Sequence, residues 1–349
     1  MAWNNDKLKE LRDKFDEKSG GEMLDPKFQE IASYIFSQGG NRPAPYAGIP
    51  SLLDAPTRSG EDALEGLQVA LYGMPMDLAV TNRNGSRFGP RAIRAIERVG
   101  PYNDAHQTAP LHQMQVADIG DVPFRSRFDL AKSHEDIEAF VNRIVESGVI
   151  PVGVGGDHSV SLPVLRVLGR DRPVGMVHID AHCDTGGAYE EEKFHHGGPF
   201  RHAVLEGVLD PERTVQIGIR GAAGYIWEFS DISGMTVIEA KDIAGMGLDA
   251  VIAKAREVVG DGPTYFSFDI DSLDPAFAPG TGTPEVGGLS TREALALIRG
   301  MKSINFVGGD MVEVAPAYDS NNNTAHAGAQ MLFEILSLMQ FSSELPSRT

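Results

Sequence analysis

Two histidines and four aspartates stand in three short segments, each directly after an apolar run typical of a buried β-strand. The segments are GGDHS at 155–159, DAHCD at 180–184 and DID at 269–271. Carboxylates that converge away from water are costly to desolvate unless a positive charge lies among them, and a divalent cation supplies that charge. The candidate metal ligands are His158, Asp180, His182, Asp184, Asp269 and Asp271.

The spacing of two residues within a segment predicts that its ligands face one side, because side chains alternate along an extended chain. Asp180, His182 and Asp184 are expected to converge in this way, whereas Cys183 would point to the other side and pack as a small apolar residue. Six ligands are too many for one ion and suit two divalent ions that share carboxylates. Two such ions about 3.5–4 Å apart hold a bridging water and activate it as a nucleophile.

The ligand types favour Mn²⁺, with Ni²⁺, Co²⁺, Fe²⁺ and Zn²⁺ as further options. A structural zinc site is not expected, because Cys183 is the only cysteine and no thiolate-rich set exists. The glycine-rich run before His158 does not fit a dinucleotide-binding loop, since G-x-G-x-x-G from Gly153 would require glycine at position 158.

The elements that must position these ligands are short apolar strands that alternate with helical patterns. This alternation predicts a three-layer α/β/α fold with a mainly parallel sheet, in which ligands lie at the carboxyl ends of the strands. Strands are expected at 68–73, 115–119, 149–153, 174–179, 214–219, 235–238, 264–268 and 304–308. Helices are expected at 90–98, 130–147, 162–168, 248–259, 291–300 and 325–339.

Residues 1–66 differ from the rest and are predicted to form an N-terminal arm or lid, with helices at 5–18 and 26–37. Their apolar content is too low for a core of their own. Residues 67–349 are predicted to form one α/β domain. The apolar stripe of the first helix needs a partner surface, in this domain or in another subunit.

Composition excludes several classes of partner. The net charge is −18, which argues against binding to nucleic acid or to an anionic membrane. No apolar run approaches the roughly 18–20 residues that span a bilayer. The charged N-terminal stretch lacks the apolar core of a secretory signal, and the lone cysteine fits a reducing compartment. We therefore expect a cytoplasmic enzyme.

Four motifs together resemble the ureohydrolase family of arginases, agmatinases and guanidino-acid hydrolases. They are GGDHS at 155–159, DAHCDT at 180–185, SFDIDSLDP at 267–275 and GTGTPEVGGLS at 280–290. The resemblance covers residues 67–349 and implies an arginase-like fold, two Mn²⁺ ions in most members and release of urea from a guanidino group. It also implies a homo-oligomer, commonly a trimer or hexamer, or a hetero-oligomer with a homologous subunit.

The resemblance implies that one ion is bound by His158, Asp180, Asp184 and Asp269. It implies that the other is bound by Asp180, His182, Asp269 and Asp271.

Further roles follow from the same resemblance. His196 matches a catalytic-loop histidine that protonates the leaving amine, and Glu313 matches a carboxylate that binds the guanidinium. Asp184 would also hydrogen-bond the bridging hydroxide. Asn82 and Arg83, in a loop close to the active-site mouth, are candidates for recognising the substrate tail.

The loop HHGGPFR at 195–201 and the long arm differ from the usual agmatinase pattern. The loop is closer to that of guanidinopropionase-like and guanidine-hydrolase-like members, some of which look Ni²⁺-dependent and near which metformin-hydrolase subunits belong. The expected substrate is therefore a guanidino acid or guanidine in preference to agmatine. The alternatives are the active subunit of a biguanide (metformin) hydrolase, an agmatinase, a metal-dependent amide deacetylase and a catalytically silent subunit.

Overall fold

The computed structural model describes residues 4–16, 23–36, 46–97, 99–221 and 224–347. The chain divides into two units, Met1–Gly48 and Ile49–Thr349. The first unit contains helices α1 (Asn5–Phe15) and α2 (Pro26–Phe36). The predicted helix ends at positions 18, 37 and 98 lie outside the described residues.

Residues 49–66 pack with the second unit, although the sequence analysis assigned them to the arm. Leu52, Leu53 and Ala55 are buried in its core, and the Leu52 amide donates a hydrogen bond to Asp118 at 2.9 Å. The apolar side chains of SLLDAP therefore find their burial on the α/β unit. The structure places the division between the units before residue 49, earlier than the predicted boundary at 66.

The second unit is built on one eight-stranded sheet in which every neighbouring pair is parallel. The strands are β1 (Val69–Met74), β2 (Val116–Asp121), β3 (Ile150–Gly155), β4 (Val174–Ile179), β5 (Leu209–Ile219), β6 (Thr236–Glu239), β7 (Thr264–Asp269) and β8 (Phe306–Val312). Their order across the sheet is β2-β1-β3-β8-β7-β4-β5-β6. The predicted parallel sheet is confirmed.

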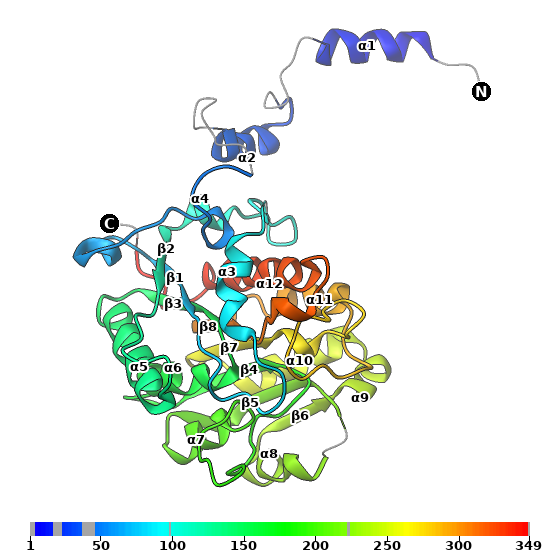
Figure 1. The fold of residues 1–349 in the computed structure, drawn as a ribbon. Coiled ribbons are helices and arrows are strands. Elements are labelled where there is room, and N and C mark those ends of the chain that lie inside the picture. The colour runs from blue at the N-terminus through cyan, green and yellow to red at the C-terminus, as the bar shows by residue number, and fades with distance from the viewer. Residues whose placement is uncertain (1–3, 17–22, 37–45, 98, 222–223, 348–349) are drawn as a thin grey trace. The chain divides into compact units, whose positions relative to one another are not determined.

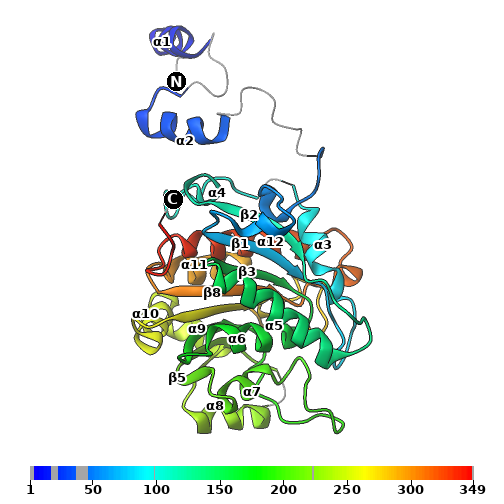
Figure 2. The same cartoon turned by 90° about the vertical axis from the view of Figure 1, so that its left-hand side faces the viewer.

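Helices follow the strands and cover both faces of the sheet (Figures 1 and 2). They are α3 (Gly89–Arg94), α4 (Pro110–Gln113), α5 (Leu130–Glu146), α6 (Ser161–Leu168), α7 (Pro199–Leu205), α8 (Glu228–Ser233), α9 (Ala240–Met246), α10 (Leu248–Val259), α11 (Thr291–Gly300) and α12 (Asn323–Met339). Of these, α4, α7, α8 and α9 were not predicted.

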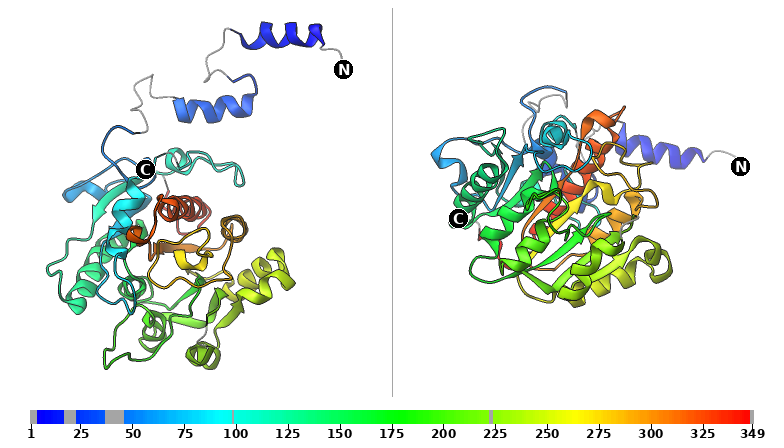
Figure 3. Two further views of the ribbon diagram at one scale, coloured as in Figure 1. Left: turned by 45° about the vertical axis from the view of Figure 1, so that its right-hand side comes forward. Right: turned by 60° about the horizontal axis from the view of Figure 1, so that its bottom comes forward.

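Two hydrophobic cores lie between the sheet and its helices, one on each face of the sheet. Ile137 of α5 and Phe200 of α7 belong to the core on one face. Val251 of α10, Leu297 of α11 and Leu332 of α12 belong to the core on the other face, where α12 lies over the central strands (Figure 3). The three-layer α/β/α fold is thus confirmed. Within the described residues, no helix is long and apolar enough to cross a membrane.

The four central strands, β3, β8, β7 and β4, are neighbours in the sheet although they are far apart in sequence. Because all strands run parallel, their carboxyl ends lie at one edge. The last residue of β7 and the turns that leave the four strands carry the predicted ligands and Glu313, so the sheet topology brings these residues to one edge.

Candidate metal centre

His158 stands at the start of the turn that follows β3, where the chain passes very close to a neighbouring segment. A Cβ atom at Gly156 would lie 1.8 Å from the carbonyl oxygen of Met76, so only glycine fits there. The short 3₁₀ turn His158–Val160 then directs the imidazole, which is fully buried, toward the ends of β4 and β7. The glycine run thus serves close backbone approach.

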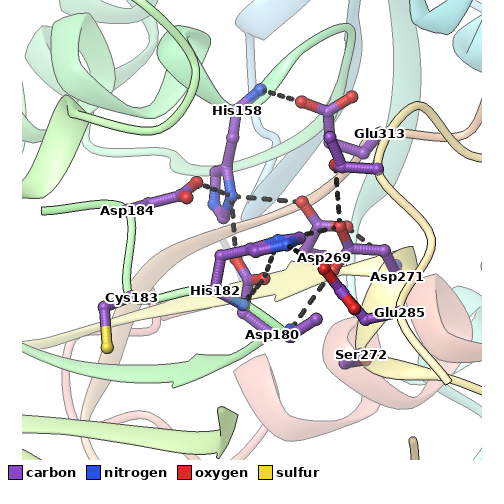
Figure 4. A network of polar contacts seen from close by, with 12 residues as sticks. His158, Asp180, His182, Cys183, Asp184, Asp269, Asp271, Ser272, Glu285 and Glu313 are labelled. Carbon is purple, nitrogen blue, oxygen red and sulfur yellow. Dashed lines mark hydrogen bonds and ion pairs between the residues drawn. The ribbon is translucent and has the colours of Figure 1, made fainter. Parts of the chain in front are cut away.

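The Nδ1 atom of His158 faces three carboxylates (Figure 4). It lies 3.1 Å from Asp180 Oδ2, 2.9 Å from Asp184 Oδ2 and 3.3 Å from Asp269 Oδ2. None of these contacts has the geometry of a hydrogen bond, and this nitrogen has no hydrogen-bond partner among the described residues. One nitrogen and three oxygens that converge in this way form a donor set for a cation.

A second group lies beside the first and shares Asp180. The Nδ1 atom of His182 is 3.1 Å from Asp271 Oδ2 and 3.5 Å from Asp180 Oδ1. Donor atoms of these three residues all lie within 4.8 Å of one another, as required for a common metal ion. The hydroxyl of Thr283 donates to Asp271 Oδ2 and holds it in place.

The electrostatics of the cluster also favour bound cations. Burial raises the pKa of Asp269 well above its usual range, and the neighbouring Asp271 and Asp180 carboxylates add to this. Burial likewise raises the pKa of Asp271, although His182 opposes the rise. Crowded buried carboxylates stay ionised only when positive charge is bound among them, so these residues fit divalent metal ions. The structure therefore brings together all six predicted ligands.

Strand alternation is not what brings the ligands together. β4 ends at Ile179 and β7 at Asp269, so Asp180, Asp184 and Asp271 lie in turns. Asp184 adopts a left-handed backbone with φ +50°, which rotates its carboxylate toward His158. The expectation of an extended segment was wrong, because the chain turns as soon as it leaves the sheet.

Cys183 is buried, and its sulfur points away from the carboxylates (Figure 4). Burial raises the pKa of its thiol, which therefore stays protonated. The expected packed, non-ligating role is consistent with this environment.

His178, to which the sequence analysis gave no role, supports the cluster from within β4. The side-chain nitrogen of Gln216 donates to the Cys183 carbonyl at 2.6 Å and to His178 Nδ1 at 3.0 Å. His178 must therefore carry its proton on Nε2, which donates to Asp180 Oδ2 at 2.7 Å. His178 thus orients a shared carboxylate. The sequence signal that could have predicted this role is its position two residues before Asp180, on the same strand face.

Glu313 follows β8 and is 1% exposed. Its Oε1 atom accepts the His158 backbone N–H at 2.9 Å and lies 2.8 Å from His196 Nδ1. Its Oε2 atom is buried and has no hydrogen-bond partner among the described residues. The backbone has φ +64°, a rarely populated conformation for a side chain of this size. The turn thus presents one free carboxylate oxygen beside the metal ligands.

His196 is buried and held at both ring nitrogens. Its Nε2 atom accepts the Thr81 backbone N–H at 3.1 Å and lies 2.6 Å from the Thr81 hydroxyl. Burial alone lowers the pKa of His196, but the Glu313 carboxylate outweighs this effect and raises the pKa to about 9. In the neutral ring, the Thr81 amide needs a lone pair on Nε2, so the proton belongs on Nδ1, facing Glu313. The imidazolium form carries a proton on Nε2 as well and gives up the hydrogen bond from the Thr81 amide. Thr81 was missed because it stands 115 residues from its partner.

Asn82 and Arg83 lie at the rim, in the loop that holds Thr81. The Asn82 side chain donates to the Gly282 carbonyl at 3.0 Å, and the Arg83 guanidinium stacks over the Tyr318 ring at 5.2 Å. A Cβ atom at Gly282 would lie 3.7 Å from Glu313 Oε2. The two loops therefore meet beside the free carboxylate oxygen.

Glu285, which the sequence analysis did not single out, has its Oε1 atom 3.9 Å from His182 Nε2. Its side chain is 37% exposed, so it forms part of the rim. Its position in the loop at 280–290 was the signal for it.

Comparison with known proteins agrees with this geometry. Residues 67–337 match the arginase family. The chain belongs to this family. It is 46% identical over 302 residues to a guanidinopropionase of Pseudomonas aeruginosa, covering 85% of this chain and 94% of that protein. It is 45% identical to a mitochondrial agmatinase of Gallus gallus, covering 84% of this chain and 86% of that protein.

Among solved structures, the chain is similar to the proclavaminate amidino hydrolase of Streptomyces clavuligerus. The TM-score is 0.82 at 33% identity, and the match covers 86% of this chain and all of that one. Fold and relatives together support a ureohydrolase, a hydrolase that acts on C–N bonds of an amidino group.

Proposed function

We propose that this arginase-family protein binds two divalent metal ions and hydrolyses a small guanidino compound to urea, or a substituted urea, and an amine or ammonia. The observation that carries the proposal is the free Oε2 atom of Glu313, buried beside two groups of metal-ligating side chains. A guanidinium offers paired N–H donors and a positive charge, which match a carboxylate that still lacks a partner.

We assign the ligands as two sets that share Asp180 and Asp269. His158 and Asp184 complete the first set, and His182 and Asp271 complete the second. Mn²⁺ suits this oxygen-rich donor set, and Ni²⁺ is the alternative that its two imidazoles also accept. Bound by these residues, the ions would lower the pKa of a coordinated water and so supply a nucleophile at neutral pH.

The protein's own residues then position and protonate the substrate. Glu313 holds the guanidinium with its carbon near the metal ligands, and Asp184 accepts the hydrogen bond of the attacking water. His196 lies at the same Glu313 carboxylate and delivers the proton that the leaving nitrogen takes when the C–N bond breaks. Burial of this pair excludes bulk water from the proton transfer.

We propose a guanidino acid or guanidine as substrate in preference to agmatine. Arg83 pairs with no carboxylate among the described residues and lies at the rim, so its charge suits the carboxylate tail of a guanidino acid. Glu285, also at the rim, would instead attract the ammonium tail of agmatine. The chain is almost equally identical to a guanidinopropionase and to an agmatinase, so sequence identity does not discriminate between the two kinds of substrate.

The test is a substrate panel on purified protein loaded with Mn²⁺ or Ni²⁺. The panel contains guanidine, 3-guanidinopropionate, 4-guanidinobutyrate, agmatine, arginine and dimethylbiguanide, and released urea or substituted urea is measured. A higher kcat/KM for guanidine or a guanidino acid than for agmatine supports the proposal. A preference for agmatine or the biguanide would show that the proposed substrate class is wrong. If none of the compounds is hydrolysed, the proposed function itself is overturned.

We further propose a homo-oligomer, as a trimer or hexamer, which light scattering on the purified chain tests. A complex that forms only with a homologous second subunit would contradict it.

A further inference from the structure

Asp310 is a fully buried carboxylate to which the proposed mechanism gives no task. It lies in the interior of β8, next to Gly153 of β3 on one side and Ser267 of β7 on the other. No lysine or arginine pairs with it among the described residues. A buried carboxylate without a cation is costly, and an apolar residue would suit the centre of a parallel strand better.

Three hydroxyl groups compensate this carboxylate. Tyr265 donates to Oδ2 at 2.6 Å, Ser267 donates to Oδ1 at 2.7 Å, and Ser161 also donates to Oδ2. All three donors are fully buried, so the arrangement is dry and fixed. Only Ser267 has a second polar partner on the side of the metal cluster.

That second partner is the proposed metal ligand His158, whose Nε2 atom lies 2.8 Å from the Ser267 hydroxyl oxygen. A hydroxyl has one proton, and Ser267 gives it to Asp310. Toward His158 the oxygen can only accept, so His158 carries a proton on Nε2. Its Nδ1 lone pair is then directed at the three carboxylates of the first ligand set.

We propose that Asp310 is a positioning residue of the metal centre, which acts on His158 through Ser267. The inference rests on the proposed metal-binding function. The relay Asp310–Ser267–His158 fixes the orientation and tautomer of the imidazole, and the negative charge at its far end makes Nδ1 a better electron donor. The relay forms a second layer behind the ligands, as His178 does behind Asp180.

The experiment measures Mn²⁺ binding by isothermal titration calorimetry on full-length protein first stripped with chelator. Ser267→Ala breaks the relay. Ser161→Ala is the matched control, because it removes a buried serine hydroxyl from the same carboxylate without touching His158. We expect Ser267→Ala to weaken one of the two Mn²⁺ binding steps about 10- to 100-fold, the usual loss for an outer-shell partner. Ser161→Ala should stay within about threefold of the wild type. Asp310→Asn should resemble Ser267→Ala.

Thermal unfolding of the chelator-treated variants separates positioning from general stability. Equal destabilisation of the two serine variants, with weakened Mn²⁺ binding only in Ser267→Ala, supports the relay. Equal Mn²⁺ affinity in both variants would overturn it, while metal binding by the wild type would leave the proposed function intact. Absence of Mn²⁺ and Ni²⁺ binding by the wild type would overturn both. If Asp310→Asn does not fold, the comparison of the two serine variants still tests the relay.

Discussion

Replacement of Glu313 by glutamine tests the proposed substrate site most directly. The substitution keeps the size and shape of a side chain that is 1% exposed, and it removes only the negative charge. In the wild type, Oε1 is already engaged by the His158 amide and by His196, and Oε2 is left for the substrate. In Glu313→Gln, an amide NH₂ or a neutral carbonyl oxygen would face the guanidinium.

The expected loss follows from the burial of the pair. Truncation of one partner of a buried, hydrogen-bonded charge pair costs about 2–5 kcal/mol. At about 1.4 kcal/mol per factor of ten, kcat/KM for the best guanidino substrate should fall about 30- to 4,000-fold. The residue is not a proposed metal ligand, so the metal content per chain should not change.

The assay is urea release at several substrate concentrations, with metal content measured on the same samples. Glu206→Gln is the control for the chemical change, since Glu206 lies in a partly exposed ion pair with Arg166 and should leave kcat/KM unchanged. If Glu313→Gln keeps kcat/KM within threefold of the wild type while binding its metal normally, Glu313 does not hold the guanidinium. If its metal content drops to zero, Glu313 belongs to the metal cage instead.

Three further predictions concern single residues. Asp269→Asn should lower urea release at least about 100-fold together with metal content, since even outer-shell changes cost about 10- to 100-fold; full metal-dependent activity would refute the cage. Thr81→Val, which keeps the backbone N–H but removes the hydroxyl next to His196, should lower kcat about tenfold without changing KM, whereas Thr81→Ser should restore it. Burial lowers the pKa of His134 to about 4. As the pH falls below about 6.5, this histidine therefore takes up a proton in the unfolded chain before it does so in the folded protein. Stability should therefore drop by up to about 3 kcal/mol between pH 7 and pH 4, and urea unfolding of His134→Gln should show a correspondingly smaller drop.

The sheet could be predicted from the sequence because each strand is a continuous apolar run, and such runs belong to buried parallel strands. The start of β5 was missed, because Asp210–Arg213 is polar although Leu209 pairs with Val174 of β4. Helix α7 was missed for a related reason. The residues HGG at 196–198 before it are typical of a loop, and the helix is short enough that its burial depends on contacts with β5 and α6.

The ligand types could also be predicted, because aspartate and histidine directly after apolar strands are uncommon without a bound charge. What could not be predicted is how their side chains converge. That depends on two turns, at Asp184 and at Ile270–Ser272, whose dihedral angles no alternation rule supplies. The supporting residues His178 and Thr81 were missed because their roles arise from partners on other strands and loops.

The distribution of hydrogen-bond donors explains how one acidic site can keep metal ions and substrate apart. Asp180, Asp184 and Asp269 each direct an oxygen toward His158 Nδ1, which donates no hydrogen bond to them. The Oε1 atom of Glu313, in contrast, already receives the His158 amide and faces His196 Nδ1. Two donors thus fix Glu313 and leave it a single oxygen, whereas the proposed ligands present three oxygens to one imidazole nitrogen. The free Oε2 atom of Glu313 still attracts a cation that brings its own N–H groups, as a guanidinium does.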